Sequence, residues 1–283
     1  MANSPQCGQP LGGVRVVSIA INLPGPVAAA RLAALGATVV KVEPPAGDPL
    51  RRFTRPFYDE LVAGQSVQTL DLKDDADRRS LEELLSDADL FITSHRIAAL
   101  ERLGLGWAEL SRRHPRLSQV AIVGHPAPHD DLPGHDLTYQ AANGMLTPPA
   151  MPTVLVADLA GAERAVTEGL AAVVHRATTG AGCFREVALS AAAEAMAAPL
   201  RHGLTTPSGL LGGALPAYGI YDTAAGHIAL AALEPHFFAR LVELLEVTGS
   251  REELEAAFAA RTAQEWQEWA AAHDVPLAAV TTV

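Results

Sequence analysis

The sequence predicts an α/β protein, in which a doubly wound parallel sheet is followed by a smaller α+β unit. β-branched runs alternate with helical patterns through residues 14–124, as in chains of βαβ units. Near residue 200 the alternation gives way to a stretch rich in Gly, Pro, Ser and Thr, which is typical of a linker. Strand and helix patterns then resume over a shorter distance. We therefore expect two domains, at residues 1–200 and 201–283.

The first domain opens with the pattern of a βαβ unit. Residues 14–19 form a short β-branched run, residues 27–35 are an Ala-rich helical stretch, and residues 38–42 form a second run. Gly36 is placed to end the helix as a C-cap. Such a unit implies a parallel sheet with a right-handed crossover. The turn at residues 22–26 does not match G-x-G-x-x-G, so no dinucleotide cofactor is predicted.

The alternation continues through the rest of this domain. Further strands are expected at residues 67–72, 89–93, 117–123 and 184–189, and helices at residues 77–85, 97–103, 107–113 and 162–177. In sheets of this type ligands bind at the carboxyl ends of the strands. Arg51, Arg52 and Arg55 follow the Pro-rich loop at residues 43–49 and form either an anion site or a solvated loop. Lys41 is interpreted as a charge at a strand end.

Residues 132–159 contain the strongest candidate for chemistry. His135 lies in a Pro-Gly-His-Asp turn, and a helical stretch and a Pro-rich loop follow it. Asp158 ends an apolar run at residues 154–156 that we interpret as a strand. A histidine and a carboxylate that leave rigid elements toward one place form a candidate acid/base pair. The alternative is that both residues belong to turns or caps, with Asp158 capping the helix that follows.

The second domain has a simpler pattern. Strands are expected at residues 218–222, 227–232 and 275–280, and helices at residues 235–245, 251–260 and 263–273.

Composition excludes several classes of partner. The net charge of −11 disfavours nucleic acid and anionic membranes, and no apolar run approaches the roughly 18 residues of a membrane span. Cys7 and Cys183 are the only cysteines, which indicates reduced thiols. The histidines lack metal-binding spacing, so no metal is predicted. With no signal-peptide pattern at the start of the chain, we expect a cytoplasmic protein.

Several segments resemble the class III CoA-transferase superfamily, whose members are similar to formyl-CoA transferase and carnitine dehydratase. They are residues 11–52, LDLK at 70–73, ERLGLGW at 101–107, PRLSQVAIVGH at 115–125 and PGHDLTYQAANG at 133–144. The resemblance implies a Rossmann-like large domain, a smaller domain and an interlocked homodimer. It also implies an acyl-CoA thioester as substrate, with coenzyme A as part of the substrate and no separate cofactor.

Two branches of this superfamily differ in what the resemblance implies for Asp158. In the transferases the aspartate is a nucleophile that takes the acyl group from its thioester. In the α-methylacyl-CoA racemases it is an acid/base that works with the histidine of a G-H-D motif, here His135. Glu234, in a Leu-Glu-Pro segment similar to that of the racemases, would orient this histidine. Backbone N–H groups of residues 158–161 are expected to stabilise the enolate oxygen.

The sequence therefore predicts a racemase or epimerase that inverts the α-carbon of a 2-methylacyl-CoA thioester through an enolate. A CoA-transferase and a non-catalytic CoA-binding subunit are the alternatives. The resemblance assigns the CoA phosphates to Arg51, Arg52, Arg96 and Arg102. It also places Asp136, from the G-H-D turn, among the CoA-binding residues, although the main role expected for its side chain is hydrogen bonding within the turn.

Three departures from the family pattern weaken the expected grip on CoA. No basic residue precedes the strand at 67–72, and a Gly-aromatic-Gly turn is replaced at residues 124–129. Relatives also continue beyond the point that corresponds to Val283, into a tail that returns to the large domain. We therefore expect an open dimer ring in a chain without that tail.

Overall fold

The computed structural model describes residues 8–281, so the predicted thiol Cys7 lies outside the described residues. The chain divides into two compact units, Met1–Ala197 and Ala198–Val283. The first contains a six-stranded sheet and the second a three-stranded sheet, both combined with helices. The predicted α/β class is confirmed. Among the helices of the described residues, none has both the length and the apolar character needed to cross a membrane.

All strands of the first sheet run parallel, in the order β3-β2-β1-β4-β5-β6. Their bounds are β1 (Arg15–Ser18), β2 (Thr38–Glu43), β3 (Ser66–Thr69), β4 (Leu90–Thr93), β5 (Ser118–Val123) and β6 (Phe184–Ala188). The chain builds outward from β1 in one direction and then, from β4, in the other. The gap between β1 and β4 is therefore the topological switch point, where doubly wound proteins bind ligands.

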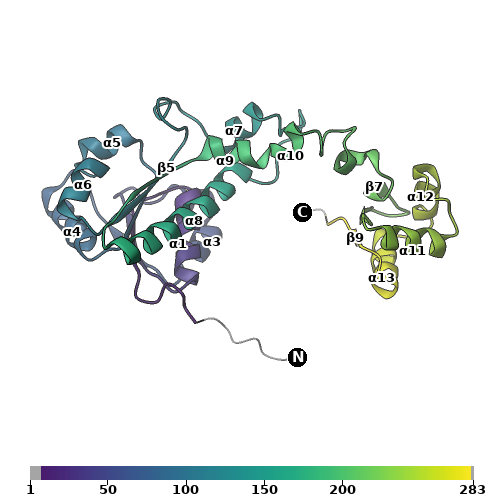
Figure 1. Ribbon diagram of the computed structural model, residues 1–283, viewed down its shortest axis with the longest axis horizontal. Helices are drawn as coiled ribbons and strands as arrows, with labels where there is room; N and C mark the ends of the chain where they lie inside the picture. The colour runs from purple at the N-terminus through teal and green to yellow at the C-terminus, as the bar shows by residue number, and fades with distance from the viewer. Residues whose placement is uncertain (1–7, 282–283) are drawn as a thin grey trace. The chain divides into compact units, whose positions relative to one another are not determined.

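Helices cover both faces of this sheet. They are α1 (Pro24–Ala34), α2 (Leu50–Phe53), α3 (Arg55–Leu61), α4 (Asp75–Ser86), α5 (Ile97–Arg102), α6 (Trp107–Arg113), α7 (Asp136–Ala142), α8 (Val156–Thr179) and α9 (Leu189–Met196). Figure 1 shows α4, α5 and α6 on one side of the strands, with α1 and α8 on the other. Neighbouring side chains of β1 pack against opposite layers of helices: Val16 packs against α1 and α8, and Val17 packs against α4 and α5. Burial on both faces explains the continuous apolar runs.

Three features differ from the sequence prediction. Residues 154–156 do not form a strand, because α8 already begins at Val156. A short apolar run does not distinguish a strand from the start of a buried helix, and this ambiguity misled the prediction. The arginine-rich loop instead contains α2 and α3, the latter with Pro56 in its first turn, a position that suits proline. Helix α9 follows β6 directly and was not predicted.

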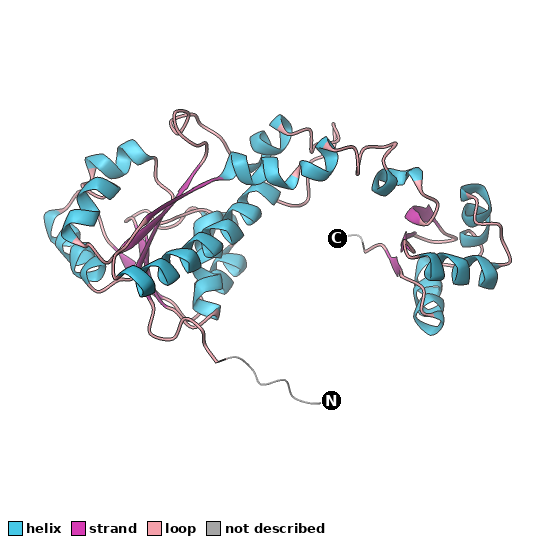
Figure 2. Cartoon of the chain, in the orientation of Figure 1, coloured by secondary structure: helices cyan, strands magenta, loops and turns pink. Residues whose placement is uncertain are grey.

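The second unit has its own small core. It contains β7 (Tyr218–Asp222), β8 (His227–Ala231), β9 (Leu277–Ala279), α10 (Ala198–Arg201), α11 (Pro235–Leu245), α12 (Arg251–Phe258), α13 (Ala263–His273) and one π-helical turn at Leu210–Ala214. Its strands pair antiparallel in sequence order, and Figure 2 shows the three long helices beside them. Tyr221, Phe258 and Trp266 form the centre of its core. The predicted bounds of β7, α11 and α13 are confirmed.

Candidate active site

A cavity of about 260 Å³ opens at the topological switch point of the parallel sheet. Its wall includes Asn22 from the loop after β1, Arg96 from the loop after β4, and Gly124 from the end of β5. These are the carboxyl ends of neighbouring strands, where the fold predicts a ligand. His135 and Asp158 complete the wall from α7 and α8. The two residues that the sequence paired for acid/base chemistry thus border one cavity.

The histidine is presented by the start of α7. His135 is the residue before the first helical turn, and its backbone N–H donates to Oγ1 of Thr138 (3.1 Å). The Thr138 hydroxyl in turn donates to the backbone carbonyl of His135 (2.8 Å). This reciprocal cap fixes the main chain while the imidazole stays exposed at the cavity.

Asp136 holds the start of α8 rather than facing the cavity. It is 3% exposed, and its Oδ1 accepts the backbone N–H groups of Ala157 (2.7 Å) and Asp158 (3.1 Å). Its Oδ2 accepts a hydrogen bond from Nε2 of Gln140 (2.5 Å). Both carboxylate oxygens are therefore engaged inside the protein. These contacts do not support the predicted role of Asp136 in CoA binding. The predicted hydrogen bonding within the turn is also not observed, because the partners lie further along α7 and at the start of α8.

Asp158 lies in the first turn of α8 and not at the end of a strand. The N-cap residue of α8 is Leu155, so the predicted N-cap role of Asp158 is wrong. Asp158 instead lines the cavity. Burial raises the pKa of this carboxyl to about 6, the negative charge of Asp136 adds to the rise, and His135 opposes it. Among the described residues, none donates a hydrogen bond to the Asp158 carboxylate.

The backbone donors predicted for an oxyanion are engaged elsewhere. The N–H of Asp158 donates to Asp136, and the N–H of Leu159 donates to the carbonyl of Leu155 (3.0 Å). The N–H of Asp158 lies in the first turn, where no acceptor exists within the helix, and the Asp136 side chain caps it. From Leu159 onward the N–H groups are bonded to carbonyls of the helix itself. The prediction that residues 158–161 supply the oxyanion donors is therefore wrong.

The four predicted CoA-binding arginines lie at different places. Arg96 is exposed and lines the cavity of Asp158. Arg51 and Arg52 are exposed on α2, and Arg102 is exposed in the last turn of α5. Arg55, grouped with them by sequence, is paired with Asp59 (2.7 Å). The structure brings only Arg96 to the cavity that holds Asp158, and the roles of the others stay predictions.

A second cavity, of about 180 Å³, lies along the same edge of the sheet. It is lined by residues that follow β2, β3 and β4, among them Pro44, Lys73 and His95. His95 lines this cavity and the adjacent Arg96 lines the first, so the loop after β4 borders both. Among the described residues, no three His, Cys, Asp or Glu side chains gather as a metal site.

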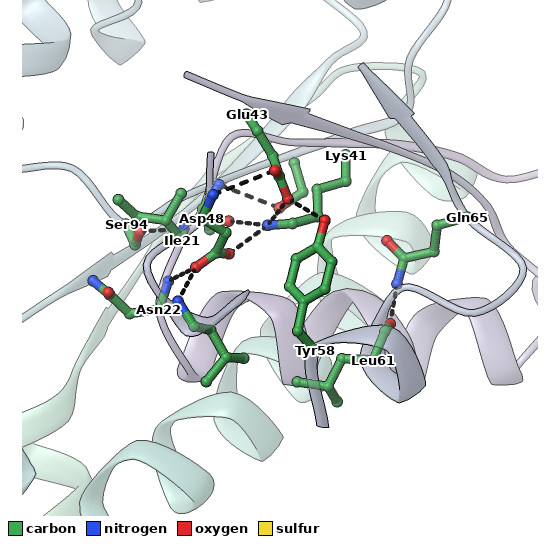
Figure 3. A network of polar contacts seen from close by, with 12 residues as sticks. Ile21, Asn22, Lys41, Glu43, Asp48, Tyr58, Leu61, Gln65 and Ser94 are labelled. Atoms are coloured by element: carbon green, nitrogen blue, oxygen red, sulfur yellow. Dashed lines mark hydrogen bonds and ion pairs between the residues drawn. The ribbon is translucent and has the colours of Figure 1, made fainter. Parts of the chain in front are cut away.

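A buried network of charges holds the loop after β1, whose Asn22 lines the first cavity (Figure 3). Lys41 is 1% exposed, so its assignment as a strand-end charge is wrong. Its Nζ contacts Asp48 (2.7 Å) and Glu43 (3.5 Å). Asp48 also accepts the backbone N–H of Asn22 (3.0 Å), which has a φ of +69°. The network therefore fixes a strained loop that lines the cavity.

Glu234 belongs to the second unit, where it directly precedes α11. It is exposed, and the backbone N–H groups of Phe237 and Phe238 donate to its main-chain carbonyl. Glu234 therefore stands at the start of a helix. Its predicted role toward His135 stays a prediction.

With this geometry in place, comparison with known proteins decides the ancestry. Residues 11–283 match the family model of CoA-transferase family III. The chain belongs to this family. It is 27% identical to a crystallised protein of Mycobacterium tuberculosis, with a TM-score of 0.81 over 96% of this chain and 84% of that one. A CAIB/BAIF family protein of Brucella suis has the same TM-score at 25% identity, with the same two coverages.

Curated members of the family that resemble this chain are named as transferases. A cinnamoyl-CoA:phenyllactate CoA-transferase of Clostridium sporogenes is 36% identical over 146 residues, 47% of this chain and 35% of that protein. A probable fatty acyl-CoA transferase of M. tuberculosis is 32% identical over 64% of this chain and 50% of that one. The chain thus spans a third to a half of these two relatives. A succinate–glutarate CoA-transferase of Agrobacterium fabrum is 29% identical over 87% of this chain and 69% of its own length.

Proposed function

We propose that this member of CoA-transferase family III transfers coenzyme A between an acyl-CoA thioester and a free carboxylic acid, with Asp158 as the nucleophile. The observation that carries the proposal is the half-buried carboxylate of Asp158, which borders a cavity at the switch point and receives no hydrogen bond from the described residues. A carboxylate that is partly desolvated and unpaired is a stronger nucleophile than one in water. The names of the three relatives point the same way.

The chemistry follows from the group that Asp158 presents. Its oxygen attacks the thioester carbonyl carbon, the C=O π pair moves to oxygen, and its return expels CoA thiolate and leaves an aspartyl mixed anhydride. The thiolate then attacks the aspartyl carbonyl of that anhydride, which forms an aspartyl-CoA thioester and releases the first acid. A second carboxylate repeats the two steps in reverse order and leaves with CoA. Asp158 is regenerated as a carboxylate.

The edge of the sheet offers a place for both ends of CoA. The thioester would occupy the cavity of Asp158. Arg96 at the wall of this cavity would supply a positive charge for the phosphates of CoA. The second cavity, with Lys73 at its wall, would take a more distant part of the molecule. Arg51, Arg52 and Arg102 remain proposed phosphate contacts outside these two cavities.

A trapping experiment tests the transferase directly. The protein is incubated with succinyl-CoA or an aromatic acyl-CoA, quenched with hydroxylamine, and digested for mass spectrometry. We expect a hydroxamate on the peptide that contains Asp158, and release of the first carboxylic acid from its thioester without any added acceptor acid. The Asp158→Asn variant should give neither. An unmodified Asp158 in a protein that binds acyl-CoA would sink the proposal.

A racemase is the second candidate, and the placement of His135 beside Asp158 in one cavity favours it. Two-base inversion would exchange the α-proton of a 2-methylacyl-CoA with solvent, with no acceptor acid present. In heavy water the racemase predicts deuterium at the α-carbon, which His135→Asn abolishes. The transferase predicts no deuterium and acyl transfer only when a second acid is added. If neither deuterium exchange nor acyl transfer is observed, the protein is a CoA-binding protein without either activity.

The assembly is proposed on the family resemblance alone. An interlocked homodimer would bring the second unit of one protomer, with its Glu234, toward the first unit of its partner. Sedimentation velocity at several protein concentrations tests this. A single species at the mass of one chain across the range would exclude the dimer.

A further inference from the structure

The hydroxyl of Tyr139 is a buried polar group at the Asp158 cavity to which the proposed function gives no role. Tyr139 lies on α7, is 2% exposed, and lines that cavity. Its hydroxyl oxygen is buried and has no hydrogen-bond partner among the described residues. Buried hydroxyls are nearly always paired, because an unpaired one loses its hydration without compensation. A partner that arrives with the ligand accounts for this one.

Two glycines make room for this phenol. A Cβ at Gly124 would lie 2.6 Å from the Tyr139 hydroxyl oxygen, and a Cβ at Gly134 would lie 2.5 Å from it. Any other residue at either position would displace the hydroxyl. The ring is also held edge-on by His125, with the ring centroids 5.2 Å apart. The end of β5 and the turn before α7 are thus built around a fixed tyrosine.

We propose that the Tyr139 hydroxyl donates a hydrogen bond to the carbonyl oxygen of the bound thioester as Asp158 attacks. This inference rests on the proposed function. During the attack the C=O π pair becomes a negative charge on oxygen, and a donor already aimed at that position stabilises it without reorganisation. The backbone N–H groups of Asp158 and Leu159 cannot serve, since both are spent. The hydroxyl keeps its proton throughout, and the charge returns to sulfur when the thiolate leaves.

The electrostatics of the site agree with a donor rather than a base. Burial raises the pKa of Tyr139, and the nearby charge of Asp158 raises it further. The phenol therefore stays protonated throughout the neutral range, when Asp158 is ionised and ready to attack. The other polar groups that line the cavity are those of Asn22, Ser94, Arg96, Asp130 and His135, and none of them is hydrogen-bonded to the phenol.

Replacing Tyr139 by phenylalanine removes the hydroxyl alone. We expect the rate of Asp158 acylation in Tyr139→Phe to fall about 100-fold, as when one oxyanion donor is deleted, with KM for the acyl-CoA changed less than threefold. The melting temperature should be equal or higher, because no hydrogen bond is lost. The control is Tyr221→Phe, whose hydroxyl donates to the carbonyl of Pro216 (2.5 Å) in the second unit. It should melt lower and acylate at the wild-type rate. An acylation rate within threefold of wild type in Tyr139→Phe overturns the proposal.

A second readout separates this proposal from the transferase reaction. An acyl-CoA with a ¹³C-labelled thioester carbonyl is bound to Asp158→Asn, which cannot be acylated, and its infrared band is recorded. A donor at the carbonyl lowers the band frequency, and adding Tyr139→Phe should remove that shift. If wild type fails to acylate but the shift depends on Tyr139, only the transferase reaction is wrong. A band that is the same with and without the hydroxyl, or a thioester that does not bind, overturns the role of Tyr139.

Discussion

At the scale of single residues, the ionisation of Asp158 controls the proposed reaction. Its pKa lies near 6 because burial and the charge of Asp136 both oppose the carboxylate. Only the ionised form attacks a thioester. We expect single-turnover release of the first carboxylic acid to rise with pH, with a midpoint near 6, and to level off above it. Titration of ¹³C-labelled aspartate by NMR gives the same pKa without turnover, and a midpoint near 4 in both experiments would contradict the environment described here.

The same shift predicts how Asp158 affects stability. A carboxyl with a folded-state pKa above its unfolded value binds protons more tightly when folded, so folding loses free energy as pH rises from about 4 to 6. Asp158→Asn removes this cost. The variant should therefore exceed wild type in free energy of unfolding by up to about 2 kcal/mol at pH 8, since the side chain is partly solvated. The difference should fall to roughly a third of that value at pH 4.5, as urea titrations at both pH values would reveal. Equal stability at pH 8 would contradict it.

Sequence reasoning predicted residue identity better than residue geometry. His135 and Asp158 were paired from their positions, and the structure places them at one cavity. The helical setting of Asp158 was missed, and with it the loss of the predicted oxyanion donors. Tyr139 follows His135 by one helical turn, which offered a signal of proximity. Its unpaired hydroxyl, however, is a property of the folded interior and has no counterpart in the sequence.

At the scale of elements, Asp136 joins α7 to α8 and so sets the direction of Asp158. Asp136→Asn keeps the size of the side chain but removes its charge and one acceptor oxygen. The amide would face Nε2 of Gln140, which cannot turn away without losing its bond to the carbonyl of Val154 (3.0 Å). We expect about 1–2 kcal/mol lower stability and a lower pKa for Asp158, because a neighbouring negative charge is gone.

Urea unfolding and the pH profile of the release of the first acid measure these two effects. The control is Glu163→Gln on the same helix, which weakens the exposed pair with Arg31 (3.0 Å). Exposed pairs contribute less than about 1 kcal/mol, so this variant should retain the wild-type stability within that limit and the wild-type pH profile. An unchanged midpoint of the pH profile in Asp136→Asn would show that Asp136 does not tune Asp158.

The buried ion pairs of Lys41 connect β2 to the loop after it, and their loss should have a larger effect on the free energy of unfolding. Lys41→Met leaves Asp48 and Glu43 buried without their cation, which costs about 3–5 kcal/mol in comparable sites. It should also loosen the Asn22 loop at the cavity, which Asp48 holds. Differential scanning calorimetry measures the first effect. Arg15→Met, which breaks an exposed pair with Asp87 (3.0 Å), serves as the control and should change stability by less than about 1 kcal/mol.

At the scale of the whole molecule, the fold class was predictable because both faces of the parallel sheet are buried. Two-sided burial produces the apolar runs from which β1, β2, β4 and β5 were identified. The strand order is not encoded in any one run, since it depends on which crossovers pack together. The switch point between β1 and β4, and therefore the location of the cavity, became visible only in the structure.

The two units have hydrophobic cores that share no residue. Phe258 is fully buried among Tyr221 and Trp266 in the second core. Phe258→Ala should remove about 3–5 kcal/mol of stability there and speed hydrogen exchange across residues 218–279. Residues 15–188 should retain wild-type protection, because their own core is intact. Exchange measured by mass spectrometry decides between this and a single cooperative unit, in which the one substitution would lower protection throughout both units.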